Sequence, residues 1–113
     1  MEIQKSAEGG VTTIKLKGEI DLHGSPVLRE EFRACAAEKA ERLLLDFTDV
    51  SYIDSSGLAT LIEYVRESGA YDGKLALFGL QKKVRTIFDL VRLNELFVIK
   101  DSREEAVAAI AGA

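Results

Sequence analysis

Apolar residues along the chain fall into short runs that are separated by glycines and polar turns. Runs of about four to eight apolar or alternating residues bounded by turn residues are typical of β-strands. Glu8-Gly9-Gly10, between the first two runs, indicates a hairpin turn. The pattern predicts strands over residues 2–7, 11–17, 43–47, 74–78 and 96–99, with extended continuations at 18–22 and 51–54.

A different periodicity, with apolar residues three and four positions apart, marks the segments between these strands. We interpret Ser25 as the N-cap of a first helix and Pro26 as its first residue. The buried face of that helix is predicted to consist of Leu28, Phe32, Cys35 and Ala36. Cys35 on this face is expected to be a small buried hydrophobic residue.

Three more helices follow from the same kind of evidence. The second is marked by Leu58, Leu61, Ile62 and Val65, and the third by Val84, Ile87, Phe88 and Val91. Ser102-Arg103-Glu104-Glu105 has the spacing of a capping box and opens a fourth helix.

Alternation of strands and helices predicts a single α/β domain over residues 1–113. Crossover helices between strands favour a mainly parallel sheet of four or five strands, with the first hairpin adding an antiparallel edge. About four helices should cover this sheet. In such open sheets, functional residues gather in the loops after the carboxyl ends of the strands.

Composition and charge narrow the function classes. The net charge of −4 argues against nucleic acid as the main partner, because phosphate binding needs a basic footprint. The basic side chains of Lys82, Lys83, Arg85 and Arg92 are interpreted as a solvated helix face. A single cysteine cannot form a zinc or iron–sulfur cluster. With neither a membrane-length apolar run nor a signal peptide, we expect a cytoplasmic protein that does not contact a membrane.

The segment Asp54-Ser55-Ser56-Gly57 carries the candidate chemistry, because it joins a buried strand to the second helix. Two interpretations stay open from the residues alone. Asp54 or one serine caps the helix. Alternatively, one serine is exposed for phosphorylation, where free backbone amides and the helix dipole would accept a phosphate.

Three segments together resemble the STAS domain family (sulfate transporter and anti-sigma factor antagonist). They are Gly18-Glu19-Ile20-Asp21, the stretch from Leu44 to Leu58, and Val84-Arg85 with Ile87-Phe88-Asp89-Leu90. The resemblance covers nearly the whole chain. Stand-alone members of this length are anti-sigma factor antagonists, and this is the function that the resemblance implies.

The resemblance also implies partners and site residues. A serine kinase of the histidine-kinase-like ATPase superfamily, which is also the anti-sigma factor, would phosphorylate the serine after the aspartate, here Ser55, with Ser56 as the fallback. The unphosphorylated protein would bind that kinase and free a sigma factor, and a serine phosphatase would reset it. The expected partner-binding residues are Asp21, Asp54, Ser56 and Gly57.

Few residues in the sequence support an enzymatic function. His23 is the only histidine, and neither a Gly-x-Ser-x-Gly motif nor a phosphate-binding Gly-x-x-x-x-Gly-Lys motif is present. We therefore expect no catalytic activity, no cofactor and no metal site. A phospho-acceptor Asp54 would need a magnesium site built from several carboxylates, with Glu19 and Asp21 as the early candidates. A second alternative is a STAS scaffold, or a subunit of a transport or signalling assembly, that is never phosphorylated.

Overall fold

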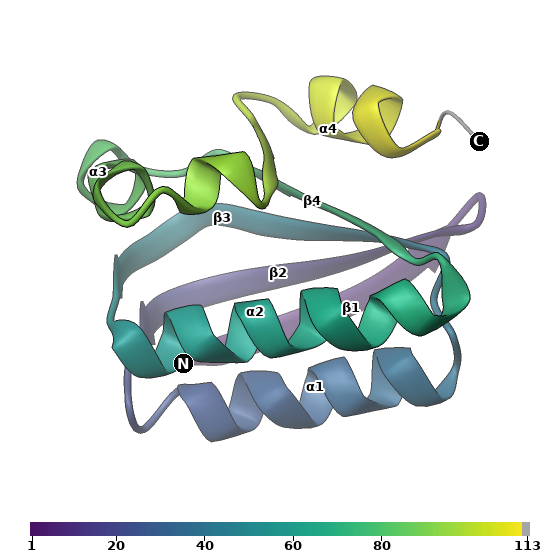
Figure 1. Ribbon diagram of the computed structural model, residues 1–113, viewed down its shortest axis with the longest axis horizontal. Helices are drawn as coiled ribbons and strands as arrows, with labels where there is room; N and C mark the ends of the chain where they lie inside the picture. Colours follow the sequence, from purple (N-terminus) through teal and green to yellow (C-terminus); the bar gives the residue numbers. More distant parts are fainter. Residues whose placement is uncertain (112–113) are drawn as a thin grey trace.

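Five strands form one mixed sheet in the order β1-β2-β3-β4-β5 in the computed structural model, which describes residues 1–111 (Figure 1). The strands are β1 (Glu2–Glu8), β2 (Val11–Ile20), β3 (Arg42–Ile53), β4 (Lys74–Phe78) and β5 (Val98–Lys100). The helices are α1 (Ser25–Ala37), α2 (Ser55–Ser68), α3 (Lys82–Leu90) and α4 (Arg103–Ala111), and short 3₁₀ turns occur at η1 (Gly69–Tyr71) and η2 (Leu93–Glu95). The predicted α/β fold is confirmed.

The antiparallel edge of the sheet is the β1–β2 hairpin. Glu8 pairs with Val11, so Gly9 and Gly10 form a two-residue turn. Their φ angles of 59° and 80° are both positive, which a type I′ turn requires and glycine adopts without a steric penalty. All later neighbouring strands are parallel. Each of their connections contains a helix, as parallel pairing demands.

Strand β3 is longer than the sequence pattern suggests. The segments predicted at 43–47 and 51–54 belong to one strand of 12 residues that ends at Ile53. Polar residues such as Thr48 and Asp49 interrupt the apolar pattern because β4 pairs only with Arg42 to Asp46. Beyond that point β3 has a strand neighbour on one side only, where β2 continues to pair with it as far as Ile53.

Helices cover both faces of the sheet, and the two cores are unequal. α1 and α2 lie side by side on one face, whereas α4 lies across the other (Figure 1). The larger core, on the α1 and α2 side, includes Leu43, Leu45 and Phe47 of β3. Val84 and Phe88 of α3 join this core, and the Phe88 ring meets that of Phe47 edge to face at 6.2 Å. The smaller core contains Leu44, Ala76, Phe78, Ala106 and Ile110.

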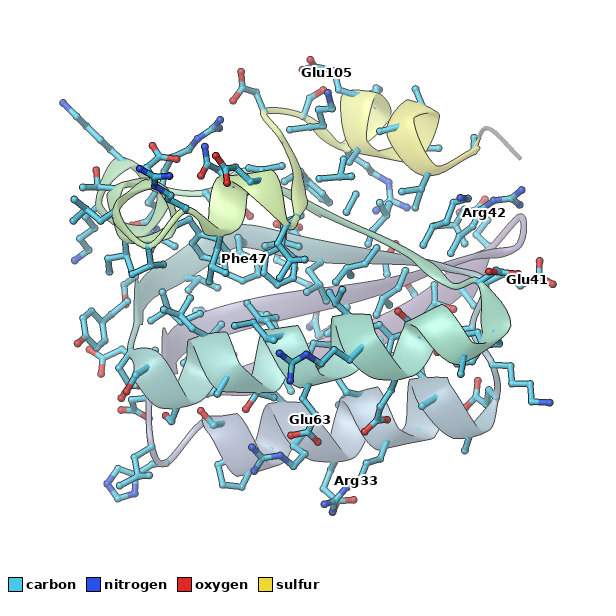
Figure 2. The ribbon with its side chains drawn as sticks, viewed as in Figure 1. Arg33, Glu41, Arg42, Phe47, Glu63 and Glu105 are labelled. Carbon is cyan, nitrogen blue, oxygen red and sulfur yellow. The ribbon has the colours of Figure 1, made fainter. Side chains whose placement is uncertain are left out.

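Contacts between elements hold the helices in place. Glu63 of α2 points towards α1 (Figure 2), and its carboxylate lies 3.6 Å from Nε of Arg29. Arg42 of β3 reaches the C-terminal end of α4 (Figure 2), where its Nε donates to the carbonyl oxygen of Ile110 at 3.1 Å. An arginine at this end satisfies carbonyl groups that have no partner within the helix.

The predicted helix boundaries were right in one case and wrong in two. Ser102 does cap α4, since its Oγ accepts a hydrogen bond from the Glu105 amide at 3.2 Å. Ser25 is not the N-cap of α1, because Gly24 occupies that position and Ser25 is the first helical residue. Val91 is not on the buried face of α3. The helix ends at Leu90, and Arg92 turns the chain with a φ of 59°, which leaves Val91 exposed.

The last strand also begins later than predicted. Residues 96 and 97 were expected to belong to it, but β5 starts at Val98 because η2 and its cap occupy the preceding positions. Leu96 is therefore exposed, whereas Phe97 enters the larger core.

Candidate phosphorylation and partner-binding site

The candidate site lies at the carboxyl ends of β2 and β3. Ile20 and Ile53, the last residues of these strands, are register partners. The loop after β2 and the residue after β3 are therefore adjacent, and the Asp54 amide donates to the carbonyl oxygen of Ile20 at 3.2 Å. Parallel pairing thus brings together two polar segments that are far apart in the sequence.

Asp54 caps α2 through a single carboxylate oxygen. Oδ1 accepts from the Ser56 amide at 2.9 Å, the Gly57 amide at 3.2 Å and the Ser56 hydroxyl at 2.6 Å. The bond from the Ser56 hydroxyl is the main reason that the pKa of Asp54 lies below its ordinary value of 3.8. The capping interpretation is confirmed. Our expectation that the amides here are free for a phosphate was wrong for two of them, because Asp54 already binds both.

The two serines of the motif have different surroundings. Ser55 is exposed, and its hydroxyl makes no hydrogen bond to any residue in the described part of the chain. Ser56 is half-buried, and its hydroxyl lies between Asp54 Oδ1 and the hydroxyl of Ser25, 3.0 Å away. Helix geometry separates the two side chains by about 100° around the axis, so neighbouring serines point in different directions.

Asp21 builds the loop that faces this helix end. Its Oδ1 accepts from the amides of His23 at 3.0 Å and Gly24 at 2.9 Å, which makes a turn of the Asx type. The hydrogen bond from Gly24 is the largest cause of the lowered pKa of Asp21. The predicted partner-binding residue therefore also has a local structural role.

Gly57 has a packing role that the sequence did not reveal. It is buried, and a Cβ at this position would lie 2.6 Å from the carbonyl oxygen of Ile20 and 2.8 Å from Cγ1 of Ile53. A side chain would hold α2 away from the strand ends. Close packing is therefore sufficient to account for glycine here, without a contact to a partner.

Exposed apolar side chains are a feature of the site that sequence reasoning missed. Leu22, in the loop after β2, is 71% exposed, and Tyr52, two residues before Asp54, is 43% exposed. Val27 on the first turn of α1 is also exposed. Their signal in the sequence was weak, because single apolar residues at the surface are common. Tyr52 lies three residues before Ser55 in the chain, and Leu22 follows β2, the strand that pairs with β3.

Within residues 1–111, no group of three or more His, Cys, Asp or Glu side chains could hold a metal ion. A phospho-acceptor role for Asp54 gains no support, because the described residues do not supply the carboxylate cluster that would hold its magnesium ion. In the same described range, no helix is both long and apolar enough to cross a bilayer. Lys82 and Lys83 are exposed on α3, as expected of a solvated face, whereas the half-buried Arg85 pairs with Asp101 at 3.5 Å and Arg92 lies beyond the helix.

Comparison with known proteins identifies the family. The STAS domain profile matches residues 2–106. The chain belongs to the STAS domain family. It is 32% identical over 94 residues to the anti-sigma-B factor antagonist of Bacillus subtilis, a match that covers 83% of this chain and 85% of that protein. Identity to the anti-sigma-B factor antagonist of Listeria monocytogenes is 29% over 92 residues, covering 81% of each chain.

Solved structures of anti-sigma factor antagonists share the fold. An anti-sigma factor antagonist from Mycobacterium paratuberculosis superposes with a TM-score of 0.89 at 23% identity, over 97% of this chain and 93% of the other. The unphosphorylated form of the anti-sigma factor antagonist SpoIIAA gives a TM-score of 0.75 at 23% identity, over 99% and 100% of the two chains. SpoIIAA has also been solved in a phosphorylated form, which gives a TM-score of 0.73 over 96% and 99%.

Proposed function

We propose that this STAS protein is an anti-sigma factor antagonist whose binding is switched off by phosphorylation of Ser55. The observation that carries the proposal is the exposed hydroxyl of Ser55 at a helix end that Asp54 caps. The family and the names of its relatives support the same function. Unphosphorylated, it would bind an anti-sigma factor and so release a sigma factor in the cytoplasm.

Ser55 is the better acceptor because a kinase has to reach the nucleophile with its phosphoryl donor in line. Ser55 offers a hydroxyl with no competing bond among the described residues. The 2.6 Å bond to Asp54 could in principle activate Ser56 as a nucleophile. However, Ser56 is half-buried, and Ser25 lies against its other side.

A phosphate on Ser55 would act on the complex more than on the fold. It adds about −1.5 to −2 charges next to Asp54 and close to the Asp21 turn. At the surface, water solvates this charge. Under a docked partner that covers Leu22 and Tyr52, an unmatched charge costs several kcal/mol, which is on the order of a hundredfold or more in affinity.

The partners of this cycle follow from the family resemblance. A serine kinase of the histidine-kinase-like ATPase superfamily, acting also as the anti-sigma factor, would add the phosphate, and a serine phosphatase would remove it. The protein itself would be a binding protein without catalytic activity. Robust nucleotide hydrolysis by the purified protein, abolished by a point substitution within it, would contradict that part of the proposal.

Phosphosite mapping combined with binding measurements tests the switch. The wild-type protein, incubated with the cognate kinase and ATP, should carry phosphate on Ser55 and lose affinity for the kinase by about a hundredfold. Ser55→Ala should bind like the unphosphorylated protein and stay bound when ATP is added. Ser55→Asp should weaken binding only in part, because it adds a single charge with planar geometry. Ser6→Ala removes an exposed serine of β1 and serves as the matched control.

Three outcomes would contradict this assignment. Phosphate found only on Ser56 would show that the fallback residue is the acceptor. A Ser55→Ala protein that still loses its binding to the kinase when ATP is added would also show that Ser55 is not the acceptor. A protein that binds a partner but is never phosphorylated would favour the scaffold or assembly-subunit function.

Asp21 is proposed to lie in the acidic rim of the docking surface. Charges at the rim of an interface mainly change the association rate and its salt dependence. Asp21→Asn retains an oxygen that can accept from the His23 and Gly24 amides, so the turn should persist. We expect weaker binding at low ionic strength and little change at high ionic strength, measured by stopped-flow association. An unchanged salt slope would remove Asp21 from the interface.

A further inference from the structure

Ser25 joins the two loops of the site through a buried hydroxyl. It is 3% exposed, and its Oγ lies 2.7 Å from the Asp21 carbonyl oxygen and 3.0 Å from Ser56 Oγ. Ser56 Oγ in turn lies 2.6 Å from Asp54 Oδ1. A continuous chain of polar contacts therefore runs from the Asp21 turn to the cap of α2.

The protons available to the two hydroxyls determine which group donates in each of these contacts. An ionised carboxylate only accepts, so Ser56 donates its single hydroxyl proton to Asp54. Ser56 Oγ can then only accept from Ser25. The Asp21 carbonyl oxygen, the other acceptor near Ser25, also receives the Ser25 amide at 2.8 Å. Ser25 Oγ donates to this carbonyl oxygen at 2.7 Å, so its single proton is shared between the Asp21 oxygen and Ser56 Oγ at 3.0 Å.

We infer that Ser25 is a positioning residue that locks Ser56 onto Asp54 and so restricts phosphorylation to Ser55. The inference rests on the proposed function, because it explains which of two adjacent serines is modified. With Asp54 on one side and Ser25 on the other, the donor position and one acceptor position of the Ser56 hydroxyl are occupied. Without Ser25, Ser56 loses one of these contacts and gains access to its other staggered rotamers.

The decisive measurement uses a background in which Ser55 is absent. Ser55→Ala should take up almost no phosphate from the cognate kinase and ATP. The double variant Ser25→Ala/Ser55→Ala should be phosphorylated on Ser56 at least tenfold faster than Ser55→Ala, as followed by mass spectrometry. Ser68→Ala/Ser55→Ala is the matched control, because Ser68 is equally buried but bonds to the Val65 carbonyl oxygen at the other end of α2. The control should remain as unreactive as Ser55→Ala.

A second measurement needs no kinase and reports on the cap itself. The pKa of Asp54 is measured by carbon-detected NMR titration of its carboxyl group. Loss of Ser25 weakens the bond from Ser56 that lowers this pKa, so the pKa should rise in Ser25→Ala and stay unchanged in Ser68→Ala. If Ser25→Ala does not fold, Ser25→Cys keeps the size of the side chain with a much weaker donor and replaces it in both experiments.

These results separate the inference from the proposed function. A double variant that is no more reactive than Ser55→Ala would overturn the positioning role, and so would an unchanged Asp54 pKa in Ser25→Ala. Absence of phosphate on Ser55 in the wild-type protein would instead overturn the proposed switch, and the Asp54 titration would then decide the role of Ser25 by itself.

Discussion

At the scale of single residues, Gly57 sets how closely α2 approaches the strand ends. Gly57→Ala would improve helix propensity by about 1 kcal/mol. The added Cβ would lie 2.6 Å from the backbone oxygen of Ile20, and no rotamer change can relieve a contact with backbone. We expect a net loss of about 1–3 kcal/mol in the free energy of unfolding, measured by urea denaturation.

Gly69→Ala is the control for this substitution. Gly69 follows α2 with an ordinary φ of −60°, and an added Cβ would meet nothing within 4 Å. Its stability should stay constant or increase by about 0.4–1 kcal/mol, because alanine restricts the unfolded chain. Equal stabilities for the two variants would show that α2 can shift to accept a side chain at Gly57.

At the scale of elements, the cap of α2 should make the free energy of unfolding depend on pH in the acidic range. The pKa of Asp54 is lowered chiefly by the Ser56 hydroxyl, and that of Asp21 chiefly by the Gly24 amide. A carboxyl group with a lowered pKa in the folded state stabilises the fold above its unfolded pKa, near 3.8. This contribution disappears as the pH falls through the folded pKa. Urea denaturation should therefore show constant stability above about pH 5 and a decline below about pH 4.

Asp54→Asn isolates the contribution of the cap. Asparagine retains an oxygen that can accept from the Ser56 and Gly57 amides but has no charge to titrate. The decline in acid should become shallower in this variant. Asp89→Asn removes an exposed carboxylate of α3 that forms no hydrogen bond within residues 1–111, and it should retain the wild-type decline. Identical acid profiles for all three proteins would contradict a titrating cap.

At the scale of the whole molecule, the two faces of the sheet should differ in local stability. α4 is held by a small core to which it contributes Ala106 and Ile110, whereas α2 packs on the larger core through Leu61 and Tyr64. Regions with few buried apolar contacts open at lower free energy than the whole domain. Native-state hydrogen exchange should therefore give α4 amides a lower opening free energy than those of α2.

Ile110→Ala provides the perturbation for this experiment. Loss of a buried isoleucine costs about 2–5 kcal/mol in well-packed cores. If α4 opens by itself, the substitution should accelerate exchange in α4 more than in α2. If both helices exchange only through global unfolding, they will share one opening free energy, and the proposed independence of α4 will be wrong.

The sequence by itself determined the order of elements and the location of the site. Period-2 and period-3.6 patterns are local properties, so they revealed the alternation of strands and helices. Gly9-Gly10 specified its turn through positive φ angles, and Ser102 specified a helix start through a side-chain bond three residues away. The resemblance at Asp54-Ser55-Ser56-Gly57 located the candidate site for the same reason, because its residues are contiguous.

Only the tertiary structure decided how that site is assembled. Ser25 was interpreted as a cap, but its hydroxyl bonds to Ser56, 31 residues away, because the parallel register places Ile20 beside Ile53. The burial of Gly57 and the commitment of two amides to Asp54 also depend on the approach of α2 to β2. Such contacts join segments that are distant in sequence, so no local pattern encodes them. They arise when strand pairing and core packing set the distances between the loops.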